Sequence, residues 1–149
     1  TAIKHYYTPL PDPPDIVIGN CNAKLNETNI GKLVAESLVP QNGGTVVMIT
    51  NNPWGEVCHY FRRRFGNHVA GRGWRTAKLS DRVKKFILLA PYKTKTSADW
   101  IAPEERVTWA RTWEEVLALL EKDYPAGAHV AVVPDATIQY FDTVATLVV

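Results

Sequence analysis

The sequence predicts an α/β domain built on an open, doubly wound (Rossmann-like), mainly parallel sheet of about five strands. Three observations predict it: short continuous apolar runs recur along the chain, these runs do not alternate with polar residues, and amphipathic windows separate them. Continuous apolar runs are typical of strands covered on both faces. Strands that alternate with helices imply right-handed crossovers and therefore a parallel sheet.

Five apolar runs are expected to form the strands, at residues 15–20, 44–50, 83–90, 106–110 and 129–134. Before them, Ile3, His5, Tyr6 and Tyr7 predict a short edge strand. Prolines at positions 9, 11, 13 and 14 exclude a helix there. We therefore expect an extended arm over residues 1–14 and a single domain over 15–149.

Three amphipathic windows are expected to form helices, at residues 30–38, 55–65 and 112–124. The first has Asn26 or Thr28 as a candidate N-cap. The last is the clearest, because Thr112 can cap it and Glu115 completes a capping box. Gly127, in a Pro-Ala-Gly sequence, marks the end of this helix.

Size and composition indicate one globular domain: the chain has 149 residues, of which 46% are hydrophobic and 21% charged. A net charge of +2 gives no basis to expect a nucleic-acid partner. Cys21 and Cys58 lie far apart, which is typical of reduced thiols in a cytoplasmic protein. No apolar stretch is long enough to span a membrane, so no membrane partner is expected. Because Thr1 opens the chain in place of Met, we expect the domain to belong to a longer protein.

Ligands of open α/β sheets bind at the carboxyl ends of the strands. A polar loop leaves the first expected strand there, with the candidate site residues Asn20, Asn22, Lys24, Asn26 and Glu27. The following helix start can attract an anion, Lys24 adds a positive charge, and the asparagines can orient hydroxyl or carboxylate oxygens. Alternatively, the asparagines only form turns and caps.

The loop after the second expected strand offers Trp54 as an aromatic wall. His59 follows on the expected helix as an acid or base, a metal ligand or a hydrogen-bonded core residue. Cys58 and His59 together with His68 lack zinc spacing, so no metal site is expected from this chain alone.

Residues 62–75 are basic and rich in glycine. They predict an anion-binding loop, with Arg64, Arg72 and Arg75 as the candidate contacts. The alternative is a solvated helix end followed by a long loop. The sequence contains no GxGxxG, Walker A or GxSxG motif, so the standard nucleotide-binding and hydrolase sites lack their parts.

Five motifs taken together resemble the C-terminal domain of the LarA-type lactate racemase family, from residue 11 to residue 141. They are PDIVIGNC at 14–21, KxNE at 24–27, GGTVV at 43–47, PxGEVxHY at 53–60 and FG…GR at 65–72. The resemblance implies a two-domain enzyme with its active site between the domains. In that family a nickel-pincer nucleotide takes a hydride from the α-carbon of a 2-hydroxy acid and returns it to either face.

The family's N-terminal domain holds most of this cofactor and supplies the covalent lysine, the nickel-ligating histidine and the acid/base histidines. The resemblance therefore implies that this chain carries no catalytic residue, binds no cofactor alone and is inactive alone. Its partners would be the missing N-terminal catalytic domain and a small 2-hydroxy acid. The residues implied to face the cleft are Asn20, Asn22, Lys24, Asn26, Glu27, Lys32, Trp54 and His59.

The family pattern Tyr-Gln-x-x-Lys is not kept in this chain. Aligned through Asn29, Lys32 stands at the Gln position and Ala35 at the Lys position. This departure indicates another 2-hydroxy acid or a sugar acid as substrate, with Lys24 or Lys32 replacing the missing cation. Two other hypotheses remain. One is a stand-alone module that binds an anionic partner through residues 62–75. The other is an independent Rossmann-like enzyme such as a methyltransferase, but this sequence lacks the glycine fingerprint of such enzymes.

Overall fold

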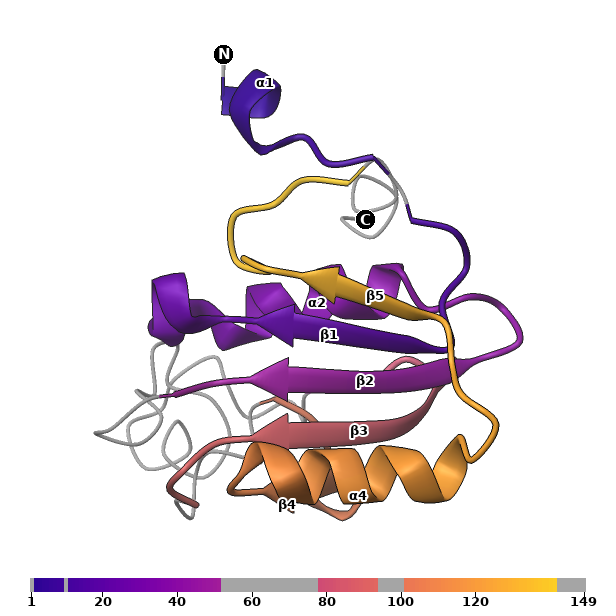
Figure 1. Ribbon diagram of the computed structural model, residues 1–149. Helices are drawn as coiled ribbons and strands as arrows, with labels where there is room; N and C mark the ends of the chain where they lie inside the picture. The colour runs from indigo at the N-terminus through magenta and orange to yellow at the C-terminus, as the bar shows by residue number, and fades with distance from the viewer. Residues whose placement is uncertain (1, 10, 52–77, 94–100, 142–149) are drawn as a thin grey trace.

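The computed structural model describes residues 2–9, 11–51, 78–93 and 101–141. Within them, one sheet has the strand order β4-β3-β2-β1-β5, and every neighbouring pair is parallel (Figure 1). The strands are Ile16–Asn20 (β1), Gly44–Ile49 (β2), Val83–Leu89 (β3), Val107–Ala110 (β4) and Val130–Val133 (β5). Each strand begins and ends within one residue of its predicted range, which confirms the parallel α/β sheet.

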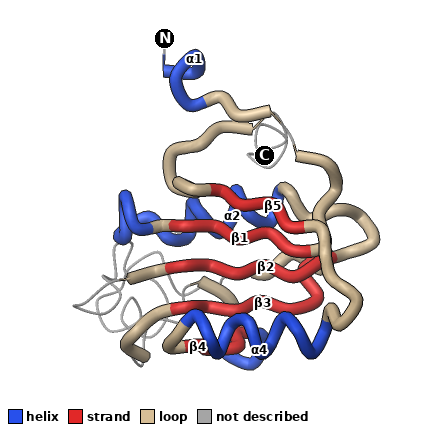
Figure 2. The backbone as a smooth tube through the Cα atoms, viewed as in Figure 1, coloured by secondary structure: helices blue, strands red, loops and turns tan. Residues whose placement is uncertain are grey.

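Helix α2 (Thr28–Ser37) covers one face of the sheet, and helix α4 (Trp113–Asp123) packs on the other (Figure 2). Adjacent residues of β2 point to opposite faces, so Val46 belongs to the core under α2 and Val47 to the core under α4. Both side chains are fully buried. Burial on both faces explains why this strand reads as a continuous apolar run.

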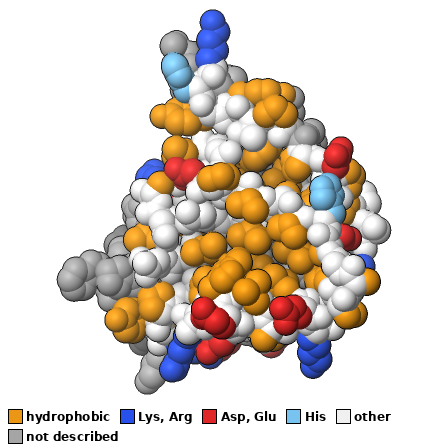
Figure 3. Space-filling model, viewed as in Figure 1, with side chains coloured by type: hydrophobic (Ala, Val, Ile, Leu, Met, Phe, Trp, Pro, Cys, Tyr) orange, Lys and Arg blue, Asp and Glu red, His pale blue; other side chains and the backbone are white. Residues whose placement is uncertain are grey.

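The α4 face of the sheet is covered only in part. Helix α4 lies over β3 and β4, whereas β5, at the far edge of the sheet, lies away from it (Figure 1). On β5, Val130 is 41% exposed and Val132 is 61% exposed. Apolar side chains gather on this side of the molecule next to α4 (Figure 3).

The start of α2 differs from the expectation. Its N-cap is Glu27, which makes no side-chain capping bond. Thr28 is already helical, and its hydroxyl donates to the Leu25 carbonyl oxygen (2.8 Å), so the prediction of Thr28 as the cap was wrong. The physical reason is a short 3-10 helix, η1 (Asn22–Glu27), that runs directly into α2 and offers the hydroxyl a local carbonyl. The backbone of Asn26 lies in η1, and its side chain lies outside the described residues.

Helix α4 has the predicted N-terminus. The Thr112 hydroxyl oxygen accepts from the Glu115 backbone N–H (3.3 Å), and a Glu115 carboxylate oxygen accepts from the backbone N–H of Arg111 (2.7 Å). In a capping box the carboxylate usually accepts from the N–H of the cap residue itself, whereas here Glu115 accepts from Arg111, one residue before the cap. This bond fixes the backbone between β4 and α4. Gly127 follows the helix with a φ of +95°, a conformation that favours glycine.

The N-terminal segment does not form the predicted edge strand. Residues Ala2–Tyr6 form a short helix, α1, that stands clear of the sheet (Figure 1). Tyr7 alone forms a parallel bridge, with Tyr140. The described residues offer no longer partner strand, and the preceding backbone satisfies its hydrogen bonds within a helical turn. The extended arm predicted over residues 1–14 is therefore helical at its start.

Two further expectations concern helices. The helix predicted at 55–65 lies outside them. Among the helices that are described, none has the length and apolar character needed to cross a membrane. A second short 3-10 helix, η2 (Glu104–Arg106), precedes β4.

Candidate functional site

Asparagines join the carboxyl ends of β1 and β2. The Asn20 side-chain oxygen accepts from the backbone N–H of Asn22 (3.0 Å), and the Asn22 side-chain oxygen accepts from the backbone N–H of Asn51 (2.9 Å). Because a backbone N–H only donates, each amide must turn its oxygen toward it. The Asn20 and Asn22 NH₂ groups are thereby left as donors at this edge. The amide oxygens of these two side chains thus stabilise the turn, as predicted, while their NH₂ groups can bind a ligand.

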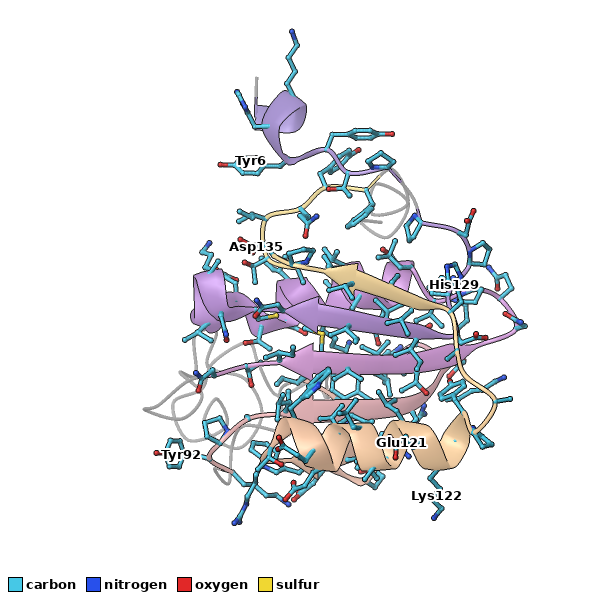
Figure 4. The ribbon with its side chains drawn as sticks, in the orientation of Figure 1. Tyr6, Tyr92, Glu121, Lys122, His129 and Asp135 are labelled. Carbon is cyan, nitrogen blue, oxygen red and sulfur yellow. The ribbon has the colours of Figure 1, made fainter. Side chains whose placement is uncertain are left out.

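A pocket of about 280 Å³ opens where β1, β2, β3 and β4 end and α4 begins. Its described lining consists of Asn22, Ile49, Asn51, Leu89, Pro91, Arg111 and Trp113. Figure 4 shows the same edge, where Tyr92, just after β3, points away from the sheet. The volume lies near the lower end of the range for small-molecule pockets, so a small ligand suits it.

Arg111 is a site residue that the sequence analysis missed. It follows the last residue of β4, lines the pocket and is exposed. Its backbone is held by Glu115, but no carboxylate of the described residues pairs with its guanidinium. The available signal was its position: Arg111 directly follows a predicted strand and directly precedes the capping Thr112. Its neighbour Trp113 supplies an aromatic wall and is 37% exposed.

Lys24 and Lys32, the cations expected at the cleft, lie in different environments. The Lys24 side chain is 51% exposed, and its Nζ lies 3.5 Å from a carboxylate oxygen of Glu27. Lys32 is only 2% exposed, and its Nζ lies 3.0 Å from a carboxylate oxygen of Glu36. The Lys32 ammonium also donates to the Lys78 carbonyl oxygen. Its positive charge is thus already neutralised inside the protein.

Glu36 completes this buried contact, because its second carboxylate oxygen accepts from the backbone N–H of Ser80 (2.9 Å). The Lys32–Glu36 pair therefore ties α2 to the segment that leads into β3. A larger and more open hollow of about 640 Å³ borders the same segment, lined by Leu33, Glu36, Lys78, Leu79, Ser80, Asp81 and Pro103. It lies toward the amino ends of the strands. We place the candidate site at the smaller pocket, because ligands of parallel sheets bind at the carboxyl ends.

The remaining predicted site residues, Trp54, His59, Arg64, Arg72 and Arg75, lie outside the described residues. Within the described part of the chain, no three His, Cys, Asp or Glu side chains come together as a metal site. Cys21, just after β1, is fully buried.

Comparison with known proteins extends these observations. No protein-family model and no curated protein sequence matches the chain. Among solved structures, the lactate racemase apoprotein from Thermoanaerobacterium thermosaccharolyticum aligns with 94% of this chain, with a TM-score of 0.60 and 17% sequence identity. The aligned region is 38% of that protein's length. The chain therefore has the fold of a segment of a lactate racemase, as its sequence motifs indicated.

Proposed function

We propose that this chain is the substrate-cleft domain of a 2-hydroxy-acid racemase or epimerase related to lactate racemase. The carrying observation is the structural likeness, which extends over 94% of this chain but only 38% of the racemase. A racemase of this kind would need a second domain to supply the rest of its active site. The pocket at the carboxyl edge supports the proposal, because it combines amide and guanidinium donors with an apolar wall.

The described pocket residues do not fit the nickel group that the family resemblance implies. Imidazole and thiolate side chains suit nickel, whereas the polar groups here are the amides of Asn22 and Asn51, the guanidinium of Arg111 and the indole of Trp113. We therefore assign no metal or hydride step to these residues. Their part in the proposed reaction is to bind and orient the acid.

The first test is the genomic reading frame on the amino-terminal side of Thr1. The proposal expects that it continues into a domain that carries a conserved lysine and several histidines. A frame that starts at or just before Thr1 would contradict the proposal and leave a stand-alone anion-binding module as the better hypothesis.

The second test is activity. The full-length protein, loaded with the nickel cofactor, is incubated with single enantiomers of lactate, other 2-hydroxy acids and sugar acids, and the products are separated by chiral chromatography. We expect racemisation or epimerisation of at least one acid, with lactate not the best substrate. If no acid is converted while a lactate racemase prepared in the same way is active, the proposal is wrong.

A further inference from the structure

We propose that Arg111 is an anion contact: together with the amide groups of Asn22 and Asn51, it binds the carboxylate of a small acid in the pocket at the ends of β1 to β4. The identity of the acid as a 2-hydroxy acid rests on the proposed function. The binding of a carboxylate does not, because it follows from the residues of the pocket.

The contacts of the three cations favour Arg111 over Lys24 and Lys32 as the group that binds an anion. Lys32 is buried and neutralised by Glu36, and Lys24 lies near Glu27. Arg111 has no carboxylate partner among the described residues. A guanidinium also presents a planar pair of donors that matches the two oxygens of a carboxylate, which an ammonium does not.

The backbones that carry these donors are held at the ends of the strands before any ligand arrives. Arg111 is fixed at its backbone by Glu115, and β4 is tied to β3 next to it, because the Ala90 N–H donates to the Ala110 carbonyl oxygen (3.0 Å). Asn22 is fixed by hydrogen bonds at both its backbone N–H and its side-chain oxygen. A fixed backbone lowers the conformational entropy that is lost on binding, so the ligand has to order only the exposed Arg111 side chain.

The rest of the pocket selects the size and character of the ligand. Ile49, Leu89, Pro91 and Trp113 supply the apolar part of the pocket lining. About 280 Å³ suits an acid of few carbon atoms better than a nucleotide. Glu114 and Glu115 are acidic neighbours on the first turn of α4. They oppose an anion, so we expect weak binding by this chain alone.

The test is an NMR titration of the 149-residue chain with glycolate, the smallest 2-hydroxy carboxylate, and with acetate. We expect saturable shifts of the backbone amides of Asn22, Asn51 and Trp113. Arg111→Gln should weaken glycolate binding about ten-fold, because a charge-assisted pair is lost, and Arg111→Lys should restore only part of it. The matched control is Lys122→Gln, which removes the same charge at the opposite end of α4 (Figure 4) and should change affinity by less than about two-fold.

Either of two results would overturn the inference. One is that Arg111→Gln and the parent chain bind glycolate equally; the other is that glycolate leaves the three amide signals of the parent chain unmoved at molar concentration. Arg111 is exposed, so the variant is expected to remain folded, and unchanged amide shifts in β1 to β3 will show this.

The titration separates this inference from the proposed function. If Arg111-dependent binding is found but the full-length protein racemises no acid, the carboxylate site stands and the racemase proposal fails. If the full-length protein is active and Arg111→Gln leaves its KM and kcat unchanged, the racemase proposal stands and the Arg111 site fails.

Discussion

At the scale of single residues, Gly31 decides how closely α2 approaches the end of β1. A Cβ at this position would lie 2.4 Å from the Cys21 sulfur and 3.3 Å from the terminal methyl of Met48. Both neighbours are fully buried and so have little room to move. Gly31 therefore sets the position of the helix that carries Lys32 and Glu36.

We expect Gly31→Ala to destabilise the protein despite the better helix propensity of alanine. Overpacking costs about 1–3 kcal/mol, against a propensity gain of about 1 kcal/mol, so the net loss in the free energy of unfolding should be about 1 kcal/mol. Urea denaturation measures it. Adding Cys21→Ala removes the closest contact, and the double variant should show a favourable coupling. A Gly31→Ala variant more stable than the parent would show that α2 can shift freely.

The candidate site was only partly predictable from single residues. Asn20 and Asn22 were found because the end of a strand is visible in the sequence and the fold class places it at the binding edge. The burial of Lys32 was not visible in the sequence, because its ammonium contacts the carbonyl oxygen of Lys78, which lies 46 positions further along the chain. Arg111 directly follows a predicted strand, but the sequence does not show which strand ends are neighbours in the sheet, so its position alone did not single it out. Its role appears only when four strand ends lie side by side.

At the scale of elements, the Lys32–Glu36 pair holds α2 to the segment before β3. Lys32→Met should leave the Glu36 carboxylate buried without its cation, and such changes cost about 3–5 kcal/mol. The comparison is Lys24→Met, where the cation is half exposed and the expected loss is below about 1 kcal/mol. Urea denaturation of both variants provides the measurement. A Lys32→Met variant no less stable than Lys24→Met would mean that the pair contributes nothing to this contact.

The first turn of α4 predicts a pH dependence. The pKa of Glu114 is lowered, first by a hydrogen bond from its own backbone N–H and then by one from the Thr112 side chain. A lowered folded-state pKa means that Glu114 stabilises the protein above the pKa of the unfolded chain, and that this contribution is lost as the pH falls through the folded value. Glu114→Gln should therefore be slightly less stable than the parent at neutral pH and equal to it in acid. Urea midpoints at both pH values test this, and a gap that persists in acid would contradict it.

The long elements were predictable because their patterns are local. Buried parallel strands read as apolar runs, and α4 carries its own cap at Thr112. The short elements were not predictable, since η1, η2 and α1 are too short for a periodic pattern. The conformation of α1 also depends on where Tyr7 finds a partner, which is set by Tyr140 at the other end of the described chain.

At the scale of the whole molecule, contacts between distant segments close the sheet at its amino edge. The backbone N–H groups of Asp15 and Ile16 both donate to the His129 carbonyl oxygen, which joins the starts of β1 and β5. Just after α4, the Tyr124 hydroxyl donates to the Asp15 carbonyl oxygen (3.2 Å) and lies 2.9 Å from the Thr45 hydroxyl of β2. One side chain thus ties the α4 crossover to two central strands. The carboxyl edge, where the pocket lies, is built on the opposite ends of the same strands.

Tyr124→Phe tests this closure. Thr45 is 2% exposed, so losing the phenol leaves a buried hydroxyl without its side-chain partner, at a cost of about 1–2 kcal/mol. Thr45→Val alone should also destabilise, because the Tyr124 hydroxyl then loses its donor. The double variant Tyr124→Phe with Thr45→Val removes both polar groups, so its loss should be smaller than the sum of the single losses. Urea denaturation of the four proteins gives the coupling. Strictly additive losses would mean that the two hydroxyls stabilise the protein independently and that the bond between them contributes nothing to holding α4 against β2.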